Sequence, residues 1–252
     1  MKPRFSIITV CRNAHEELMR TRASVFSQNC GDFEWIVIDG ASADGTLEAM
    51  SAMEDPRISF LSEPDSGIYD AMNKGLHLAV GEWVWFLNAG DVLYDENTLY
   101  QLNGVPHGTD ICYGEVLIEG PDGRVLGTRS EVTPHGLPEC LVQAGFRRGM
   151  LVSHQAFVVR REIAPDYLSG SYRYSADLDW MLRVLAVPRD ARSMGTLARV
   201  LREGATMQHW RQSQWERFLI LGHHFGQVSN IVTHLGIFLR RLRHGLRSSY
   251  WK

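Results

Sequence analysis

The sequence predicts an α/β domain with a mixed, mostly parallel sheet, flanked by helices and followed by a C-terminal helical tail. Strand-like apolar segments alternate with helical segments up to residue 103, which is typical of a parallel sheet covered on both faces. A hairpin pattern follows, so the rest of the sheet should be mixed. The 252 residues suffice for one large domain.

Four strands and three helices are expected in the N-terminal part. Continuous apolar runs predict the strands, and Gly, Asp and Ser break the chain between them. The helices carry apolar residues three and four positions apart, and Thr46 can cap the second of them. The expected strands are 5–10, 35–38, 58–61 and 83–87, and the expected helices are the stretch ending at Phe26, 46–53 and 68–80.

The C-terminal part is less regular. Segments 111–119 and 125–129 flank Gly-Pro-Asp-Gly and predict a hairpin, whereas 130–149 has the composition of a loop. A strand is expected over 155–159 and a helix over 176–187. From Leu221 onward, apolar residues recur at helical spacing, but four glycines argue against one unbroken rod: Gly222, Gly226, Gly236 and Gly245.

Composition excludes several classes of protein. A net charge of -3 gives no global basic field, so no nucleic-acid partner is expected. Residues 217–252 nevertheless hold six basic residues and no acid. The N-terminus shows no signal peptide and no run of about 18 apolar residues occurs, so a cytoplasmic protein is expected. Four dispersed cysteines indicate reduced thiols, not a zinc site or a disulfide framework: Cys11, Cys30, Cys112 and Cys140.

Polar residues follow each of the four expected strands, where ligands bind in an open parallel sheet. Asp, Asn and Gly also populate turns and helix caps, so any single position has an ordinary structural explanation. Four carboxylate-rich ends in succession favour a nucleotide bridged by Mg²⁺ or Mn²⁺. The chain lacks GxGxxG after the first strand, GxxxxGK[ST] and GxSxG, which disfavours dinucleotide dehydrogenases, P-loop NTPases and α/β-hydrolases.

Three ordered segments carry a family resemblance. SIITVCRN, IVIDGASADGT and SEPDSGIYDAMNKGLHLAVGEWVWFLNAGD resemble the family-2 inverting glycosyltransferases of GT-A fold, closely over residues 4–95 and more loosely over 150–187. The motifs GIYDAMNKG and FLNAGD are most similar to those of bacterial enzymes of exopolysaccharide and lipopolysaccharide assembly of the colanic acid type. The resemblance implies metal-dependent, inverting transfer of one sugar from a nucleotide diphosphate sugar to a glycan or lipid-linked acceptor.

The resemblance and the strand ends together assign a donor side. Asp91 is the expected ligand of Mg²⁺ or Mn²⁺, because the usual Asp-x-Asp motif here reads Asn-Ala-Gly-Asp. Met72 replaces the Arg that is usual before Asn73, which removes one expected base contact. The residues expected to bind the nucleotide sugar are Thr9, Arg12, Asn13, Asp39, Gly40, Asp65, Gly67, Asn73, Asn88 and Ala89.

An inverting transfer needs a carboxylate that takes the proton of the acceptor hydroxyl. By resemblance this general base is Asp177, although Ala176 stands where the family often has Glu and Asp177 could also cap the helix that begins there. Further contacts to acceptor or donor sugar are expected from His154, Gln155, Asp179 and Trp210. His154 could equally be a structural histidine, and Trp210 a core residue.

These expectations divide the chain into a catalytic domain, 1–210, and a basic amphipathic tail, 211–252. Within the domain, 1–103 would bind the nucleotide sugar and 104–210 the acceptor. Residues 211–235 are expected to pack on the domain or on a second subunit, which leaves a homodimer open, whereas 236–252 are expected to lie on the anionic inner face of the membrane. A degenerate nucleotide-sugar-binding or scaffold subunit is the alternative function. Nucleotidylyl transfer is disfavoured, because no Gly-rich basic loop lies near the N-terminus.

Overall fold

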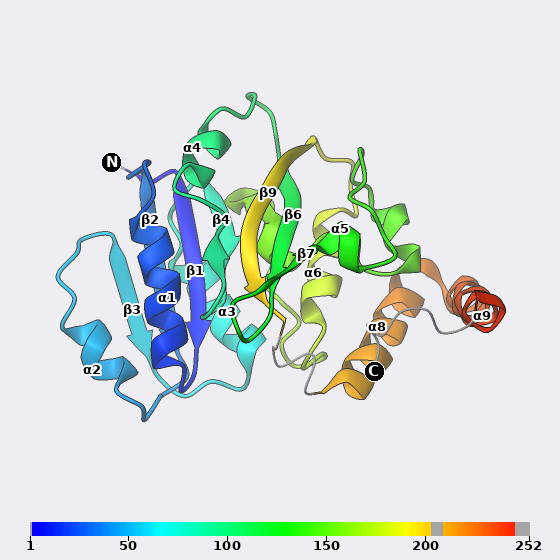
Figure 1. Ribbon diagram of the computed structural model, residues 1–252, viewed down its shortest axis with the longest axis horizontal. Helices are drawn as coiled ribbons and strands as arrows, with labels where there is room; N and C mark the ends of the chain where they lie inside the picture. Colours follow the sequence, from blue (N-terminus) through cyan, green and yellow to red (C-terminus); the bar gives the residue numbers. More distant parts are fainter. Residues whose placement is uncertain (1, 203–208, 245–252) are drawn as a thin grey trace.

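The computed structural model describes residues 2–202 and 209–244, with side chains up to residue 235. Nine strands form one sheet in the order β3-β2-β1-β4-β8-β6-β9-β5, with β7 paired to β6 (Figure 1). The C-terminal helices lie at the end of the molecule opposite β2 and β3.

The N-terminal part is the parallel sheet that the sequence predicts. Strand β1 pairs with β2 and β4 in parallel, and β2 pairs with β3 in parallel. The chain builds outward from β1 to β3 and then returns to the other side of β1, so the strand order reverses between β1 and β4. A ligand crevice is expected at the carboxyl ends of the strands beside such a reversal. The bounds are β1 (Phe5–Cys11), α1 (His15–Phe26), β2 (Phe33–Asp39), α2 (Thr46–Ser51), β3 (Ile58–Ser62), α3 (Ile68–Leu78) and β4 (Trp83–Phe86).

The C-terminal part of the sheet is mixed. The expected hairpin of β6 and β7 is confirmed, and β6 also pairs antiparallel with β8 and parallel with β9. Strand β8 joins this part to β4 in antiparallel pairing, and β5 pairs antiparallel with β9. Strands β5 and β9 were not expected from the sequence. The bounds are β5 (Val92–Leu93), β6 (Ile111–Glu119), β7 (Val125–Thr128), β8 (Phe157–Arg160) and β9 (Ala191–Leu201).

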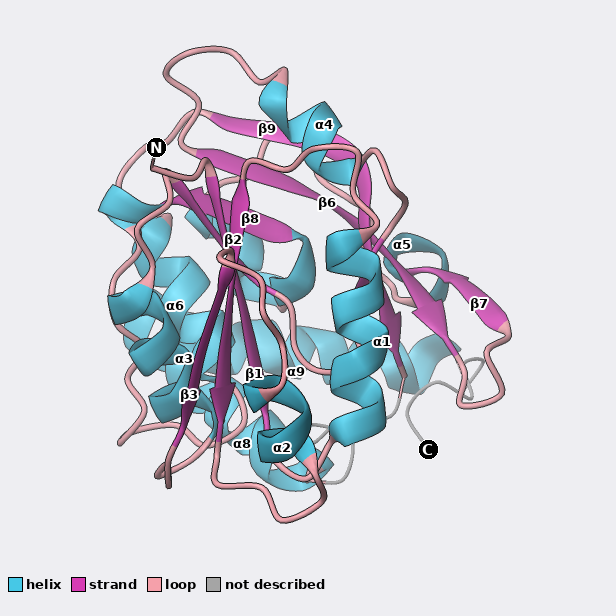
Figure 2. Cartoon of the chain, turned by 90° about the vertical axis from the view of Figure 1, so that its left-hand side faces the viewer, coloured by secondary structure: helices cyan, strands magenta, loops and turns pink. Residues whose placement is uncertain are grey.

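Helices cover both faces of the sheet. Leu18 of α1, Met50 of α2 and Leu99 of α4 (Thr98–Asn103) pack in one core on one face. Met72 of α3, Trp180 of α6 (Ala176–Val184) and Ile220 of α8 (Trp210–Phe225) pack in a second core on the other face. Figure 2 shows β1, β2 and β3 between α1 on one side and α3 and α6 on the other.

Two segments differ from expectation. The stretch expected as a loop contains a short helix, α5 (Arg129–Val132), and a 3-10 helix, η1 (Gln143–Arg148). The tail is not one continuous helix. Among the described residues the helix is interrupted at Gly226, which has a φ of 84° and lies between α8 and α9 (Gln227–His244). Gly222 lies inside α8 and Gly236 inside α9. No helix among the described residues is long and apolar enough to cross a membrane.

Candidate active site

The loops that follow β1 and β2 are tied together by hydrogen bonds. The backbone N–H of Asn13 donates to Oγ of Ser42 at 2.7 Å, and the Asn13 side-chain oxygen accepts from the N–H of Ala43 at 2.9 Å. Asn13 holds a φ of 50°, a left-handed conformation that asparagine tolerates. Arg12 is exposed beside this junction. The two strand ends therefore form one rigid edge from which Arg12 extends.

Asp39, at the end of β2, is fully buried, and its hydrogen bonds hold the loop after β2 in place. Its carboxylate accepts from the N–H of Ser42 at 3.0 Å and from the hydroxyl of Ser62 at 2.6 Å, and the Ser42 hydroxyl makes a further short contact. Thr9 is also fully buried, and its hydroxyl accepts from the indole N–H of Trp35 at 2.9 Å. The Thr9 hydroxyl thus lies in the core, not at the strand ends.

Gly40, Asp65 and Gly67 form the next part of the edge. A Cβ on Gly40 would lie 2.4 Å from Oδ2 of Asp65, so any larger residue would force that carboxylate to move. Oδ1 of Asp65 accepts from the N–H of Gly67 at 2.9 Å. Gly67 has a φ of 133°, which L side chains rarely adopt, and α3 begins at the next residue. The chain therefore turns sharply into α3 at the carboxyl end of β3.

Asp91 lies beyond the end of β4 and is almost fully buried. Burial raises the pKa of Asp91 to about 7, against the opposing hydrogen bond from Gln155. The Gln155 amide donates to Oδ2 of Asp91 at 3.0 Å, so the structure brings these two expected site residues together. The backbone N–H of Ala89 pairs with the carbonyl of Val10, which fixes the segment beside β1.

Asn88 adds an unpaired acceptor next to Asp91. Its side-chain oxygen is buried and has no hydrogen-bond partner in the described part of the chain. A buried orphan acceptor is costly unless a ligand satisfies it. Asn88 and Asp91 offer oxygen ligands of the kind that Mg²⁺ and Mn²⁺ prefer, so they fit the expected metal. Among the described residues, no group of three or more His, Cys, Asp and Glu side chains is arranged to hold a metal ion.

Asp177 lies in the first turn of α6 and is half-buried. Its Oδ1 accepts from the hydroxyl of Tyr69 at 3.2 Å and from the N–H of Leu178 at 2.9 Å. A helix N-terminus stabilises a carboxylate, because its free N–H groups and the helix dipole favour negative charge. The Asp177 carboxylate is thus oriented by α3 and α6 together while remaining partly accessible.

An aromatic cluster joins Asp177 to the Asp91 side of the site. Tyr69 stacks on Tyr167, whose hydroxyl lies 2.6 Å from Nε2 of His154. Burial lowers the pKa of His154 to about 4, so the imidazole is neutral at physiological pH. His154 is followed directly by Gln155, which contacts Asp91. A continuous series of contacts therefore runs from Asp91 to Asp177.

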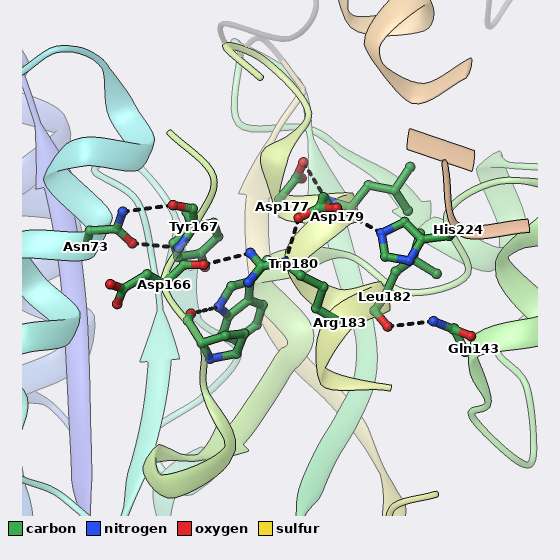
Figure 3. Close-up of polar contacts among 12 residues, drawn as sticks. Asn73, Gln143, Asp166, Tyr167, Asp177, Asp179, Trp180, Leu182, Arg183 and His224 are labelled. Atoms are coloured by element: carbon green, nitrogen blue, oxygen red, sulfur yellow. Dashed lines mark hydrogen bonds and ion pairs between the residues drawn. The ribbon is translucent and has the colours of Figure 1, made fainter. Parts of the chain in front are cut away.

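Asn73 and Asp179 are both engaged inside the protein. The Asn73 side chain pairs with the backbone of Tyr167 through two hydrogen bonds of 2.7 and 3.0 Å. Asp179 is 1% exposed and lies between Nε of Arg183 at 2.7 Å and Nε2 of His224 at 2.8 Å (Figure 3). Burial alone would raise the pKa of Asp179, but the hydrogen bonds from His224 and Arg183 outweigh it and lower the pKa. These contacts give Asn73 and Asp179 structural roles in this structure.

Helix α8 supports the segment that leads into α6. The buried carboxylate of Glu216 accepts from the backbone N–H groups of Arg173 and Tyr174 at 3.1 and 2.8 Å. Trp210 is 39% exposed at the start of α8, directly after His209, whose ring stacks on Tyr174. Tyr69 and Glu216 were not expected from the sequence to contribute to the site. The one sequence feature that distinguishes Glu216 is its position, because it is the last acidic residue before the stretch from Arg217 onward, whose charged residues are all basic.

The chain is similar in sequence to proteins of a known family. Residues 6–168 match the family model described as glycosyl transferase family 2. The PGL/p-HBAD biosynthesis glycosyltransferase of Mycobacterium bovis is 34% identical over 196 residues, covering 74% of this chain and 71% of that protein. The succinoglycan biosynthesis protein ExoO of Rhizobium meliloti is 24% identical over 151 residues, covering 59% of this chain and 43% of that protein.

Solved structures share the fold. The S. aureus TarS 1-349 complex with UDP-GlcNAc has a TM-score of 0.66 and 16% identity, covering 95% of this chain and 73% of that chain. The mannosyltransferase PcManGT from Pyrobaculum calidifontis, in complex with GDP-Man and Mn²⁺, has a TM-score of 0.65 and 15% identity, covering 97% of this chain and 76% of that chain. The GT-A fold expected from the sequence is confirmed.

Proposed function

The chain belongs to glycosyl transferase family 2, and from this premise we propose that it transfers one sugar from a nucleotide diphosphate sugar to a glycan or lipid-linked acceptor, with inversion. One observation carries the proposal: a continuous series of contacts links Asp91 at the end of β4 to Asp177 at the start of α6. Donor and acceptor functions need such a fixed relation, because the two substrates must meet in line.

The strand ends supply the donor side of the proposed site. Arg12 and Asn13 at the end of β1, with Gly40 after β2, would receive the nucleoside, and the buried Asp39 would hold these loops in place. Asn88 and Asp91 would hold Mg²⁺ or Mn²⁺, and a bound ion would supply positive charge to the diphosphate. The two structural neighbours carry different donors, UDP-GlcNAc in one and GDP-Man with Mn²⁺ in the other, so both nucleotides belong in any test.

Asp177 is the proposed general base. Its carboxylate takes the proton from the acceptor hydroxyl while the hydroxyl oxygen bonds to the anomeric carbon and the bond to the diphosphate breaks. The acceptor approaches the side of α6 that Tyr174 and Trp210 border. Gln155 orients Asp91, and His154 stays neutral beneath the site.

The biological setting is part of the same proposal. We assign the product to a cell-surface polysaccharide or glycolipid, because the relatives are named for PGL/p-HBAD and succinoglycan biosynthesis. We assign the reaction to the cytoplasm, because all four cysteines are free in the structure and buried or exposed thiols persist in a reducing compartment.

The test is a donor screen followed by one variant. UDP, GDP and dTDP sugars are compared by thermal shift with Mn²⁺, and the stabilising donor is then assayed for transfer and hydrolysis. Asp177→Asn should lower turnover about 10² to 10⁴-fold while donor affinity stays within a factor of about two. Donor binding without turnover by the unaltered protein would support the scaffold alternative instead. Full turnover by Asp177→Asn would remove Asp177 as the base.

A further inference from the structure

Helix α9 contacts the rest of the protein through a polar face. Asn230 is 3% exposed, and its side-chain amide donates to the carbonyl of Phe218 in α8 at 2.8 Å. The ring of His234, one turn further along, packs edge-on against Phe218 with centroids 5.0 Å apart. Thr233 is half-buried on the same side. The face of α9 that meets the domain is therefore made of amide, imidazole and hydroxyl groups.

The opposite face of α9 is apolar and exposed. Four aliphatic side chains at helical spacing line it, with exposed fractions of 79, 54, 64 and 54%: Val228, Ile231, Val232 and Leu235. Positions three, four and seven apart lie on one side of a helix, so these residues form a single stripe, here called the α9 stripe. A surface helix normally has the reverse arrangement, with its apolar stripe toward the core. Such a continuous exposed apolar patch indicates an interaction surface.

The described elements that neighbour α9 expose basic residues. Between residues 209 and 235 the single acid is Glu216, which is buried and accepts two backbone hydrogen bonds. Arg211 is exposed on α8, and η1, which packs against α9, exposes Arg147 and Arg148. Arg147 also lies over the ring of Phe225, at the end of α8.

The sequence continues both features. Leu239, Leu242 and Leu246 keep the apolar spacing of the α9 stripe, and no acid occurs in 236–252. The same segment carries Arg240, Arg241, Arg243, Arg247 and Lys252. The side chains of this segment lie outside the described residues.

We propose that α9 lies on an anionic lipid surface, with the α9 stripe in the boundary between headgroups and acyl chains. An interfacial helix needs an apolar face together with basic residues, and α9 joins the two. Each basic residue near an anionic membrane adds attraction that salt screens. Pairing of two copies through this stripe would instead bring two basic surfaces together, which disfavours a second copy as the occupant.

The location of α9 ties a membrane to the candidate site. Figure 1 shows α9 at the end of the molecule, beyond α8. His224 of α8 contacts Asp179 of α6 at hydrogen-bond distance, and α6 also contains Asp177. A lipid surface at α9 would thus bring a lipid-linked acceptor close to α6. Membrane binding itself does not depend on the proposed transfer reaction.

The test uses the full chain and two kinds of vesicle. Co-sedimentation is measured with vesicles of phosphatidylcholine alone and with equimolar phosphatidylcholine and phosphatidylglycerol, at low and high salt. The triple variant Val228→Ser, Ile231→Ser, Val232→Ser should lower partitioning onto anionic vesicles at least about tenfold, because apolar area leaves the interface. Arg147→Glu with Arg148→Glu should weaken the same binding and reduce its salt dependence.

A matched control removes exposed apolar side chains elsewhere. Val80→Ser, Val125→Ser and Val187→Ser alter valines that are each 49% exposed and lie outside α8 and α9; this triple variant should sediment as the unaltered protein does. Equal sedimentation of the α9 variant and the unaltered protein would overturn the proposal. A second result would also overturn the proposal. If light scattering showed that the unaltered protein is a dimer and the α9 variant a monomer, and neither bound vesicles, a second copy would cover the stripe. Donor binding, measured separately, should be unchanged in every variant.

Discussion

The hydroxyl of Tyr69 donates a hydrogen bond of 3.2 Å to Oδ1 of Asp177. The two residues are 108 positions apart, and they meet because α3 and α6 cover the same face of the sheet. Burial, and then the nearby Asp177 charge, raise the pKa of Tyr69 well above its ordinary value, so the phenol stays protonated and remains a donor. Tyr69 therefore orients the proposed base without competing for its proton.

Tyr69→Phe should lower kcat about tenfold and leave donor affinity unchanged, because the carboxylate loses one orienting hydrogen bond but keeps its chemistry. Steady-state kinetics with the transferred donor, together with calorimetry of nucleoside diphosphate binding, separates the two effects. Tyr100→Phe, on the exposed surface of α4, is the matched control. Loss of donor affinity in Tyr69→Phe would show that Tyr69 acts at the nucleotide instead.

The strands β1, β2 and β4, which the sequence predicted, are buried on both faces. They are mostly apolar, and the turns after them contain the Asp, Asn and Gly that end a strand. Strand β9 was not predicted, because its eleven residues include Arg, Ser, Gly and Thr, and only Leu197 and Ala198 are buried. It becomes a strand because β6 offers a pairing edge from a distant part of the chain, and such pairing leaves no local pattern.

Site residues divide in the same way. Asp91 was predicted from the polar residues after the fourth strand and from the family resemblance, and Asp177 from the resemblance alone; their roles as metal ligand and base stay predictions. The supports were not predictable. Glu216 meets the backbone of Tyr174 across 42 positions, and this contact depends on how α8 packs. The sugar contact expected of Asp179 stays a prediction, and the partners of its carboxylate, Arg183 and His224, were not expected from the sequence.

His224→Ala should lower the free energy of unfolding by about 1 to 3 kcal/mol, because Asp179 would lose one of two partners while remaining buried. Urea unfolding followed by circular dichroism measures the change. His223→Ala is a close control, since His223 is the exposed neighbour on the same helix. Equal midpoints for the two variants would mean that Arg183 alone satisfies Asp179.

Acid should destabilise the protein through His154. The unfolded chain takes up this proton near its ordinary pKa of about 6.5, whereas the buried imidazole resists protonation down to about 4. Because the unfolded state binds the proton first, stability is complete above about pH 6.5 and falls by up to about 3 kcal/mol toward pH 4. His154→Gln, which keeps an acceptor for Tyr167, should flatten this part of the unfolding profile. The exposed His107→Gln should leave the profile as it is, and an unchanged slope in His154→Gln would contradict the assignment.

Metal binding should depend on pH through Asp91. Burial raises the pKa of this carboxyl to about 7, and a carboxyl must lose its proton before it can bind Mn²⁺. The apparent Mn²⁺ affinity in the presence of UDP or GDP should therefore rise about tenfold per pH unit below about pH 7 and level off above it. Calorimetry at a series of pH values measures the slope. Asp91→Asn should bind Mn²⁺ more weakly and show a shallower slope, because only the terminal phosphate of UDP or GDP, with a pKa of about 6, then titrates in this range, while Asp122→Asn, at an exposed turn between β6 and β7, should match the unaltered protein. A pH-independent affinity in the unaltered protein would mean that the metal is held by other groups than the Asp91 carboxylate.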